Sequence, residues 1–315
     1  MESAILGIDT SCYTTSVAVV SGQRQLICEE RMLIPVPKES CGIAQNQALF
    51  HHIKQVPQCL EKLFSRIDKQ KITGICASAR PRPADGSYMP VFVFSESLGR
   101  SLAAAAQIPF FVSTHQEGHL TAALWSQNLD WDDFLAVHLS GGTTELLLAA
   151  KEKDGFSVEV LGGCDLAAGQ MVDRVGVALG LSFPAGPQLE LLAKTAVKPN
   201  FKLPVAAKGL QISFSGPESA AQRLIKKGID HGALAVALFE NIASTLSQVI
   251  ATAAERTGLN RVLIAGGVAA NSLVKNELAI RLPSLEVRFA EPDFAGDNAV
   301  GVALLGLQKY LGEKG

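Results

Sequence analysis

Three absences in the sequence exclude common classes of protein. Lysine and arginine number 28 against 30 acidic residues, so the chain has no overall basic charge with which to hold nucleic acid by its phosphates. The six cysteines are scattered and form no CxxC pair, which favours reduced, mostly buried thiols over a disulfide framework or a zinc ribbon. Apolar segments are broken before the ~20 residues that span a bilayer, and no signal-peptide pattern opens the chain. We therefore expect a cytoplasmic protein without a membrane segment, in which any RNA is held by a local patch or by a partner subunit.

The bulk of the sequence is suited to two packed lobes. Its 315 residues are 48% hydrophobic and 18% charged, which is enough apolar material for two cores and argues against extended disorder. No low-complexity segment or flexible linker interrupts the chain. We expect the lobes to pack directly against each other.

An internal repeat supports this organisation. The segment LGIDTSCYTTSVAVV, from Leu6, aligns without a gap with LAVHLSGGTTELLLA, from Leu135. Each copy predicts a strand, a tight polar turn and a second strand, with a third strand near 25–29 and 156–161. Two unrelated hairpins are the alternative, which the gapless match makes less favourable.

Two lobes that each open with such a hairpin resemble the plan of the actin, hexokinase and Hsp70 ATPases, whose two turns hold nucleotide phosphates through backbone N–H groups. The resemblance implies a duplicated α/β fold with mixed sheets flanked by helices. The lobes would span 1–130 and 131–296, with a C-terminal helix at 297–315 that packs back on the first lobe. Within them we expect strands at 72–78 and 262–265, and helices at 95–107, 165–179, 233–256 and from about 269.

The segment HQEGH carries two histidines four residues apart, His115 and His119. Residues i and i+4 lie on one face of a helix, so both imidazoles can bind one metal ion, although a chance pair on a surface helix is the simpler explanation. Glu117 lies about 200° around the helix from His115. Unlike the glutamate of the HExxH zinc proteases, it is a poor candidate for a protease base.

Three glycine-containing segments are suited to binding nucleotide or metal. SGGTT, 140–144, follows an apolar strand, and its glycines let the backbone approach a phosphate, although an ordinary hairpin turn has the same composition. IAGGVAANSLV, 264–274, places Asn271 at a junction between a strand and a helix, where Gly-Gly is common for structural reasons alone. In FAGDNAVG, 294–301, Asp297 is either the N-terminal cap of the last helix or an oxygen ligand for a metal.

Together these motifs resemble the TsaD family of tRNA threonylcarbamoyladenosine synthases over almost the whole chain. The family's opening LGIETSCDDTSVA is similar to LGIDTSCYTTSVA, and its AGEAFDKVA is similar to AGQMVDRVG from Ala168. Its HxEGH, VSGGHTQL, FSFSG, AGGVAAN and TDNAAMIA motifs are similar to segments at 115–119, 139–146, 212–216, 265–271 and 296–303. The motifs keep their order and spacing, so the resemblance is specific.

The resemblance implies a role for each matching residue. The metal would be bound by His115, His119 and Asp297. A nucleotide would be bound by a second set of residues: Ser140, Gly141, Gly142 and Thr143 at the phosphate, Asp173, Gly186 and Glu190 at the ribose, and Asn271 at the nucleotide or acyl-adenylate. The ligands would be a divalent metal and ATP, ADP or threonylcarbamoyl-AMP. The family transfers the threonylcarbamoyl group to the adenosine 3′ of the tRNA anticodon, with partner subunits that in bacteria are a degenerate paralogue and a small ATPase. A homodimer is a further possibility.

The first turn departs from the family pattern. Tyr13 and Thr14 stand where the family has two consecutive acids, which leaves Asp9 and Thr14 as catalytic candidates. Two functions therefore stay open: an acyltransferase that acts on tRNA, or a catalytically weak paralogue that binds nucleotide and metal and acts as a regulatory or assembly partner. A metalloprotease is disfavoured by the position of Glu117, and a small-molecule kinase by the absence of a second acid beside the phosphate turns.

The position of His138 predicts a fourth metal ligand. It lies two residues before Ser140 on a strand, so the two side chains share a face. In archaeal members of the resembling family, a metal-binding tyrosine occupies this position. Three histidines and one aspartate suit Zn²⁺ or Fe²⁺ better than Mg²⁺. The alternative is a buried strand histidine that is hydrogen-bonded to a neighbour.

Overall fold

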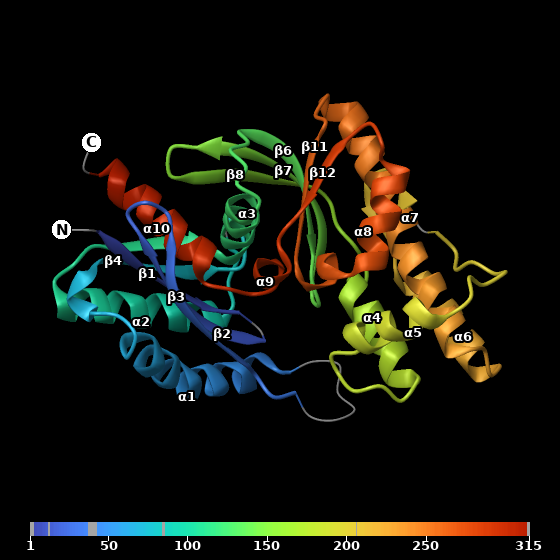
Figure 1. Cartoon of the computed structure of the whole chain (residues 1–315), viewed down its shortest axis with the longest axis horizontal. Helices are drawn as coiled ribbons and strands as arrows, with labels where there is room; N and C mark the ends of the chain where they lie inside the picture. The colour runs from blue at the N-terminus through green and yellow to red at the C-terminus, as the bar shows by residue number, and fades with distance from the viewer. Residues whose placement is uncertain (1–2, 12, 37–42, 84–85, 206, 314–315) are drawn as a thin grey trace.

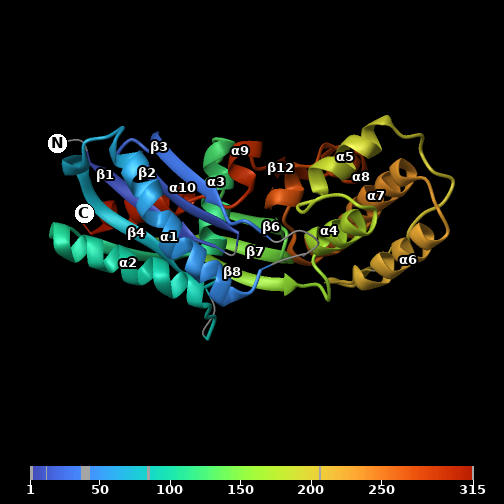
Figure 2. The same ribbon diagram turned by 90° about the horizontal axis from the view of Figure 1, so that it is seen from below.

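A computed structural model describes residues 3–11, 13–36, 43–83, 86–205 and 207–313. Figures 1 and 2 show two halves side by side, each built on one sheet. Two of the cysteines, Cys12 and Cys41, lie outside the described residues, as does part of the stretch 80–88.

The two sheets have the same topology. Their strand orders are β3-β2-β1-β4-β5 and β8-β7-β6-β11-β12. In each sheet three antiparallel strands form a meander, and the last two strands run parallel to the first of the meander. The third strands expected near 25–29 and 156–161 are thereby confirmed as β3 and β8. The strands are β1 (Ala4–Thr10), β2 (Thr14–Ser21), β3 (Leu26–Leu33), β4 (Ile72–Arg80), β5 (Phe110–Thr114), β6 (Asp133–Leu139), β7 (Thr144–Glu152), β8 (Gly155–Gly162), β11 (Arg261–Ala265) and β12 (Glu286–Phe289), beside a small pair, β9 (Ala207–Lys208) and β10 (Gln211–Ile212).

The predicted helices begin at different residues than expected: the helix expected from 233 begins at His231, and the one expected from 297 begins at Val300. The three other starts have local explanations. The helix expected from 165 begins at Ala168, because the Asp165 carboxylate accepts a hydrogen bond from the Phe214 backbone N–H (2.9 Å) and is used outside the helix. The helix expected from about 269 begins after Asn271, whose Oδ1 caps it. The helix expected from 95 begins at Pro90, a residue favoured in a first turn. The helices are α1 (Gln45–Phe64), α2 (Pro90–Ala106), α3 (His115–Ser126), α4 (Ala168–Ala178), α5 (Gly186–Thr195), α6 (Ser215–Lys226), α7 (His231–Thr257), α8 (Ser272–Arg281), α9 (Pro292–Ala295) and α10 (Val300–Gly312), with 3₁₀ turns η1 (Lys69–Lys71) and η2 (Gly267–Ala270).

Both faces of each sheet are covered, so alternate strand residues enter different cores. In β1, Leu6 and Ile8 pack towards α1, whereas Ile5 packs with residues of α10. In β6, Leu135 joins the core made with α4–α8, while Phe134 joins a core made with α3. As Figure 1 shows, α3 therefore lies between the two sheets, and α10 covers the first sheet.

One helix among the described residues, α7, has the length and hydropathy of a membrane span. Of its most apolar window, 67% is buried inside the second half of the protein. Leu238, Phe239 and Ile242 are among the buried residues, and they pack in the core made with α4–α8. This burial is typical of the core helix of a soluble protein.

Glycines bring α10 into contact with the backbone of its neighbours. A Cβ added at Gly301 would lie 1.9 Å from the carbonyl oxygen of Gly118 in α3. One added at Gly7 would lie 2.5 Å from the Ala299 carbonyl oxygen, and one at Gly306 would lie 2.4 Å from the Cys76 Cβ. No side chain fits at these crossings, so the distance between α10, α3 and β1 is set by backbone contact.

We expect Gly301→Ala to lower the free energy of unfolding by about 3 kcal/mol or more, because the added methyl group overlaps a backbone atom that cannot rotate away. Gly216→Ala in α6 is the matched control, since a Cβ there meets nothing within 4 Å. Both substitutions gain the same helix propensity, so the difference between their free energies of unfolding measures the steric effect at the α3–α10 crossing. Equal urea midpoints for the two variants would contradict this account of the α3–α10 contact.

Candidate metal centre and nucleotide pocket

The two histidines of HQEGH lie at the first turn of α3, directly after β5. Thr114 caps this helix: its Oγ1 accepts a hydrogen bond from Glu117 N (3.2 Å), and Glu117 Oε2 accepts one from Thr114 N (3.0 Å). Glu117 is thus occupied at the cap, and its carboxylate faces away from the histidines, as the sequence predicts. The cap holds the first turn so that His115 and His119 stand one above the other.

The two histidines meet Asp297, which comes from the segment before α10. His115 Nε2 lies 3.1 Å from His119 Nε2, and Asp297 Oδ1 lies 3.6 Å and 3.3 Å from those two atoms. Ser11 donates a 2.6 Å hydrogen bond to Asp297 Oδ2. The N-cap residue of α10 is Ala299, and Asn298 Oδ1 accepts a hydrogen bond from Val300 N, so capping does not occupy Asp297. The three residues form a group whose possible ligand atoms all lie within 4.8 Å of one another.

Asp9 lies behind this group rather than in the cleft. It is fully buried, and its carboxylate accepts hydrogen bonds from His115 Nδ1 (3.1 Å) and from the Ser78 hydroxyl (2.5 Å). A carboxylate on the far nitrogen of a ligating histidine fixes the tautomer and the ring orientation. The geometry therefore suits Asp9 to positioning His115. Thr14 is also buried, on β2, and its backbone oxygen faces the Ser11 hydroxyl at 3.3 Å.

The electrostatics of the group are suited to a cation. Burial disfavours charge on His115, but the charge and hydrogen bond of Asp9, with the charge of Asp297, outweigh it and raise the pKa of His115 to about 9. Burial also opposes ionisation of Asp297, yet its hydrogen bond with His119 and the nearby histidine charges hold the pKa of this carboxyl well below its usual range. A divalent ion that displaced the proton at His115 Nε2 would meet the Asp297 carboxylate, while Asp9 remains hydrogen-bonded to Nδ1 on the far side of the ring.

His138 lies on β6 at the edge of this group. Its ring centroid is 4.8 Å from that of His119 and 6.3 Å from that of His115. Burial, with the neighbouring His119 and His115, lowers the pKa of His138 well below its ordinary value, so the imidazole is neutral. Its Nε2 is buried and has no hydrogen-bond partner among the described residues, whereas the alternative explanation requires a histidine that is hydrogen-bonded to a neighbour. A buried nitrogen without a partner beside this donor set fits a ligand that the protein atoms do not supply.

The turn at 140–143 allows a ligand to approach its backbone closely. Ser140 N donates to the Thr143 carbonyl (2.9 Å), and Thr143 N donates to Ser140 Oγ (3.1 Å), which closes the turn. A Cβ at Gly141 or Gly142 would meet nothing within 4 Å, so open space lies above their backbone. The other side of the turn is packed: a Cβ at Gly169 would lie 2.4 Å from Gly141 Cα. Exposed backbone held in a rigid turn is the arrangement that binds phosphate.

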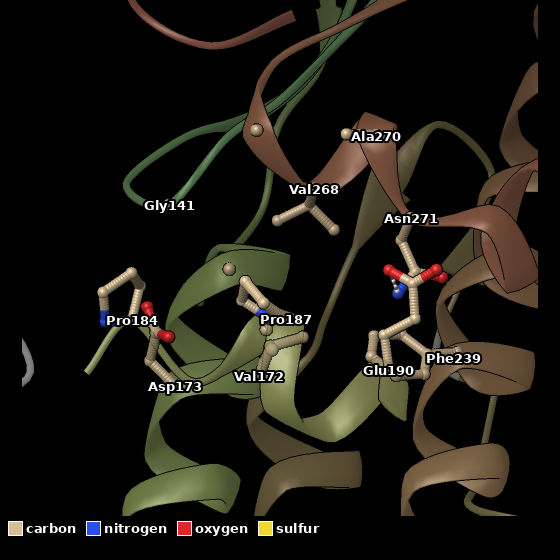
Figure 3. A pocket seen from close by; sticks show the side chains of 13 residues that line it. Gly141, Val172, Asp173, Pro184, Pro187, Glu190, Phe239, Val268, Ala270 and Asn271 are labelled. Carbon is tan, nitrogen blue, oxygen red and sulfur yellow. Dashed lines mark hydrogen bonds between the residues drawn. The ribbon is translucent and has the colours of Figure 1, made fainter. Parts of the chain in front are cut away.

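A pocket of about 320 Å³ opens beside this turn (Figure 3). Asp173 lines it, and its Oδ1 accepts a 2.8 Å hydrogen bond from Ala185 N. Across the pocket Asn271 Nδ2 donates to Glu190 Oε2 (3.2 Å), while Glu190 Oε1 accepts from the Ser272 hydroxyl (2.5 Å). These two residues therefore tie α5 to α8. The lining comprises Gly141, Gly169, Val172, Asp173, Pro184, Gly186, Pro187, Glu190, Phe239, Gly267, Val268, Ala270 and Asn271.

A second pocket, of about 420 Å³, lies between the two halves and is lined by His115 and Asp297, two of the three residues of the candidate metal group (His115, His119 and Asp297, here called the metal group). It is lined by Ser11, Tyr13, Pro81, Met89, Phe92, His115, His138, Ser140, Gly141, Gly142, Thr143, Gly267, Gly296 and Asp297. Gly141 and Gly267 line both pockets, so the two spaces meet at the phosphate-type turn. We call this second space the central pocket and the first the side pocket.

The structure brings the predicted residues into two neighbouring places, with Asp9 and Thr14 buried behind one of them. Sequence reasoning missed several others. Ser11 could have been found, because the repeat aligns it with Ser140. Phe239 and Val268 line the side pocket, but they are apolar residues of a core helix and a 3₁₀ turn, and nothing in their sequence context distinguishes them from ordinary core.

Comparison with solved structures concerns the fold. HypF from T. kodakarensis matches with a TM-score of 0.64 at 15% identity, over 99% of this chain and 48% of that one. Component A of (R)-2-hydroxyglutaryl-CoA dehydratase from Acidaminococcus fermentans matches at 0.61 and 16%, over 98% and 99% of the two chains. A ROK family glucokinase from Streptomyces griseus, solved with glucose and AMPPNP, matches at 0.57 and 13%, over 98% and 100%. These matches confirm the expected duplicated fold of the actin and hexokinase type.

Comparison of sequences identifies the family. The model of the family described as tRNA N6-adenosine threonylcarbamoyltransferase, TsaD, matches residues 30–304. A tRNA N6-adenosine threonylcarbamoyltransferase from Thermus thermophilus is 32% identical over 97% of this chain and 93% of its own length. One from Archaeoglobus fulgidus is 30% identical over 97% and 91%. The chain belongs to the TsaD family of tRNA N6-adenosine threonylcarbamoyltransferases.

Proposed function

We propose that this protein transfers a threonylcarbamoyl group from threonylcarbamoyl-AMP to the adenosine 3′ of the tRNA anticodon. The observation that carries the proposal is the meeting of the two pockets at Gly141 and Gly267. An acyl-adenylate has a nucleoside, a phosphate and an acyl group in that order. The side pocket, the Ser140–Thr143 turn and the central pocket follow one another in the same order, so one ligand can occupy all three.

Each part of the site has a role in this proposal. Asp173, Gly186 and Glu190 hold the ribose, Asn271 contacts the nucleotide, and the turn Ser140, Gly141, Gly142 and Thr143 donates to the phosphate. The acyl group then extends towards His115, His119 and Asp297. In the transfer, the exocyclic amine of adenosine forms a bond to the carbamoyl carbon, the bond from that carbon to the phosphate oxygen breaks, AMP leaves with the electron pair, and the amine loses one proton.

The donor set supports a divalent metal in the central pocket. Imidazole nitrogen with one carboxylate oxygen is a set that Zn²⁺ or Fe²⁺ accepts. We include His138 as the fourth ligand because its buried Nε2 has no hydrogen-bond partner in the part of the chain that the structure describes. A bound metal would polarise the carbamoyl carbonyl as a Lewis acid. Asp9 keeps the His115 ring oriented, and Ser11 holds Asp297 by a hydrogen bond. These two contacts use His115 Nδ1 and Asp297 Oδ2, which leaves His115 Nε2 and Asp297 Oδ1 available to the metal.

A second function is favoured by one observation. The first turn offers no carboxylate to the central pocket at Tyr13 or Thr14, and Asp9 is engaged behind His115. The protein would then be a catalytically weak paralogue that binds nucleotide and metal. It would assemble with, or regulate, a TsaD family member that has the two consecutive acids. In either case we propose that the protein is cytoplasmic and has no membrane segment. We also propose that it works with the partner subunits of the family, a degenerate paralogue and a small ATPase, and that it is a possible homodimer.

The transfer itself is tested in cells depleted of their own synthase and supplied with the partner subunits. We expect the gene to restore threonylcarbamoyladenosine in digested tRNA, measured by mass spectrometry. Asp297→Asn should abolish restoration, because it removes charge from the metal group. Asp293→Asn, at an exposed position four residues earlier, is the control and should behave as the unmodified gene. Failure of the unmodified gene, with nucleotide binding intact, would favour the paralogue.

Nucleotide binding is tested by thermal shift. With a divalent metal and ADP or ATP at about 100 times its Kd, we expect the Tm to rise by about 5 °C, since a ligand that binds only the folded state stabilises it by about 2.7 kcal/mol. Asp173→Ala should lose most of the rise, whereas Asp154→Ala, on an exposed turn of the same half, should keep it. A missing shift with every adenine nucleotide would refute the assignment of the side pocket.

The metal assignment is tested by titrating Zn²⁺ and Fe²⁺ into the metal-free protein by calorimetry. We expect His138→Ala to weaken binding about tenfold or more or to change the preference between the two ions, and His115→Ala to abolish tight binding. His231→Ala, exposed at the start of α7, should leave both affinities unchanged. Unaltered affinity and preference in His138→Ala would show that this histidine is structural.

A further inference from the structure

An aromatic contact crosses from one half of the protein to the other. Tyr13 lies in the first turn, between β1 and β2, and Phe183 lies in the loop between α4 and α5. Their ring centroids are 6.0 Å apart, and the rings are tilted by 49°. Tyr13 lines the central pocket, whereas Phe183 lines neither pocket and is followed by Pro184 of the side pocket. Phe183, a residue of the other half, therefore packs against the Tyr13 ring.

The lining of the central pocket is of two chemical kinds. We call one part the polar wall: it includes Ser11, His115, His138, Asp297 and the turn 140–143. The apolar or aromatic side chains form the other, the apolar wall: Tyr13, Pro81, Met89 and Phe92. Phe92 is 2% exposed, and its ring packs on that of His115 with centroids 5.5 Å apart, so its main contacts lie within the core. Tyr13 is half-buried and offers the aromatic surface of this wall.

A wall of this kind suits a flat, aromatic group that carries a polar substituent. A purine base stacks on a tyrosine through its face, and the same base can direct an exocyclic amine towards the polar part of the lining. A carboxylate at position 13 would not provide such a face. The threonylcarbamoyl group itself is not aromatic, so the apolar wall is not suited to the acyl donor.

We propose that Tyr13 is the stacking platform for the purine base of the acceptor nucleoside, and that Phe183 holds its ring in place. This inference rests on the proposed transfer to an adenosine and specifies where its base binds. Tyr13 contacts the acceptor and takes no part in moving protons. Because the platform is completed by residues of both halves, the base is bound only when the two halves are together.

The test uses the full chain with its partner subunits and an anticodon stem–loop RNA that carries 2-aminopurine at the position 3′ of the anticodon. Stacking on an aromatic ring quenches 2-aminopurine, so we expect the unmodified protein and Tyr13→Phe to quench its fluorescence. Tyr13→Ala should not quench, and Phe183→Ala should quench partly. Tyr88→Ala, which alters a tyrosine of the same half that is 69% exposed and outside the central pocket, should quench as the unmodified protein does.

Kinetics provide the second readout. In Tyr13→Ala we expect the KM for unlabelled RNA to rise about tenfold or more, because stacking contributes on the order of that factor for each base, and the KM for threonylcarbamoyl-AMP to stay unchanged. The nucleotide-induced thermal shift should also be unchanged, which shows that the variant is folded. Equal quenching by Tyr13→Ala and the unmodified protein, or no quenching by either, would overturn the platform.

The two hypotheses fail in different ways. If the unmodified protein transfers no threonylcarbamoyl group but quenches the probe in a way that depends on Tyr13, the platform stands and the proposed transfer does not. If transfer proceeds and its KM for RNA is the same in Tyr13→Ala, the transfer stands and the platform is wrong.

Discussion

The backbone contact between α3 and α10 is the constraint on which the metal group depends. Gly118 and Gly301 let the two helices touch without an intervening side chain. His115 and His119 lie on one side of this crossing, and Asp297 lies just before the other helix. A side chain at Gly301 would separate the helices, and the 3.3 Å approach of Asp297 to His119 would be lost. The distance between ligands is thus set by packing that lies outside the ligands themselves.

The buried carboxylate of Asp9 complements this packing. Among the hydrogen bonds of the described residues, its oxygens accept from His115 and from Ser78, a residue of the neighbouring strand β4. A buried charge is costly unless it is paired and hydrogen-bonded. The Asp9 carboxylate therefore stabilises one orientation of the His115 ring and raises the pKa of this histidine. Asp9, near the end of β1, therefore supports the metal group from behind, and Ser11 of the first turn holds Asp297, while the matching turn at 140–143 faces open space. Equivalent turns in the two halves have different roles.

The cleft is shaped by residues of both halves. The side pocket belongs to the second half, with Asp173, Glu190 and Asn271 on α4, α5 and the cap of α8. The central pocket needs the first half as well, since Ser11, Tyr13 and His115 line it opposite the turn at 140–143. The proposed nucleotide binding and the proposed acyl transfer therefore make different demands on the fold: the former needs one half, and the latter needs the two halves in contact.

The sequence by itself determined the family and those elements that have a clear local pattern. The repeat, the strand and helix periods and the spacing of HQEGH follow from local patterns, and the structure agrees with them except at helix starts, where Asp165 and Asn271 make side-chain hydrogen bonds. Only the tertiary structure decided which residues meet. Asp9 and His115 are separated by 106 residues, and Ser11 and Asp297 by 286. The partnership of Tyr13 and Phe183 has no signal in either local sequence. Contacts of this kind depend on how whole elements pack, and packing leaves no period or spacing in the chain from which they could be predicted.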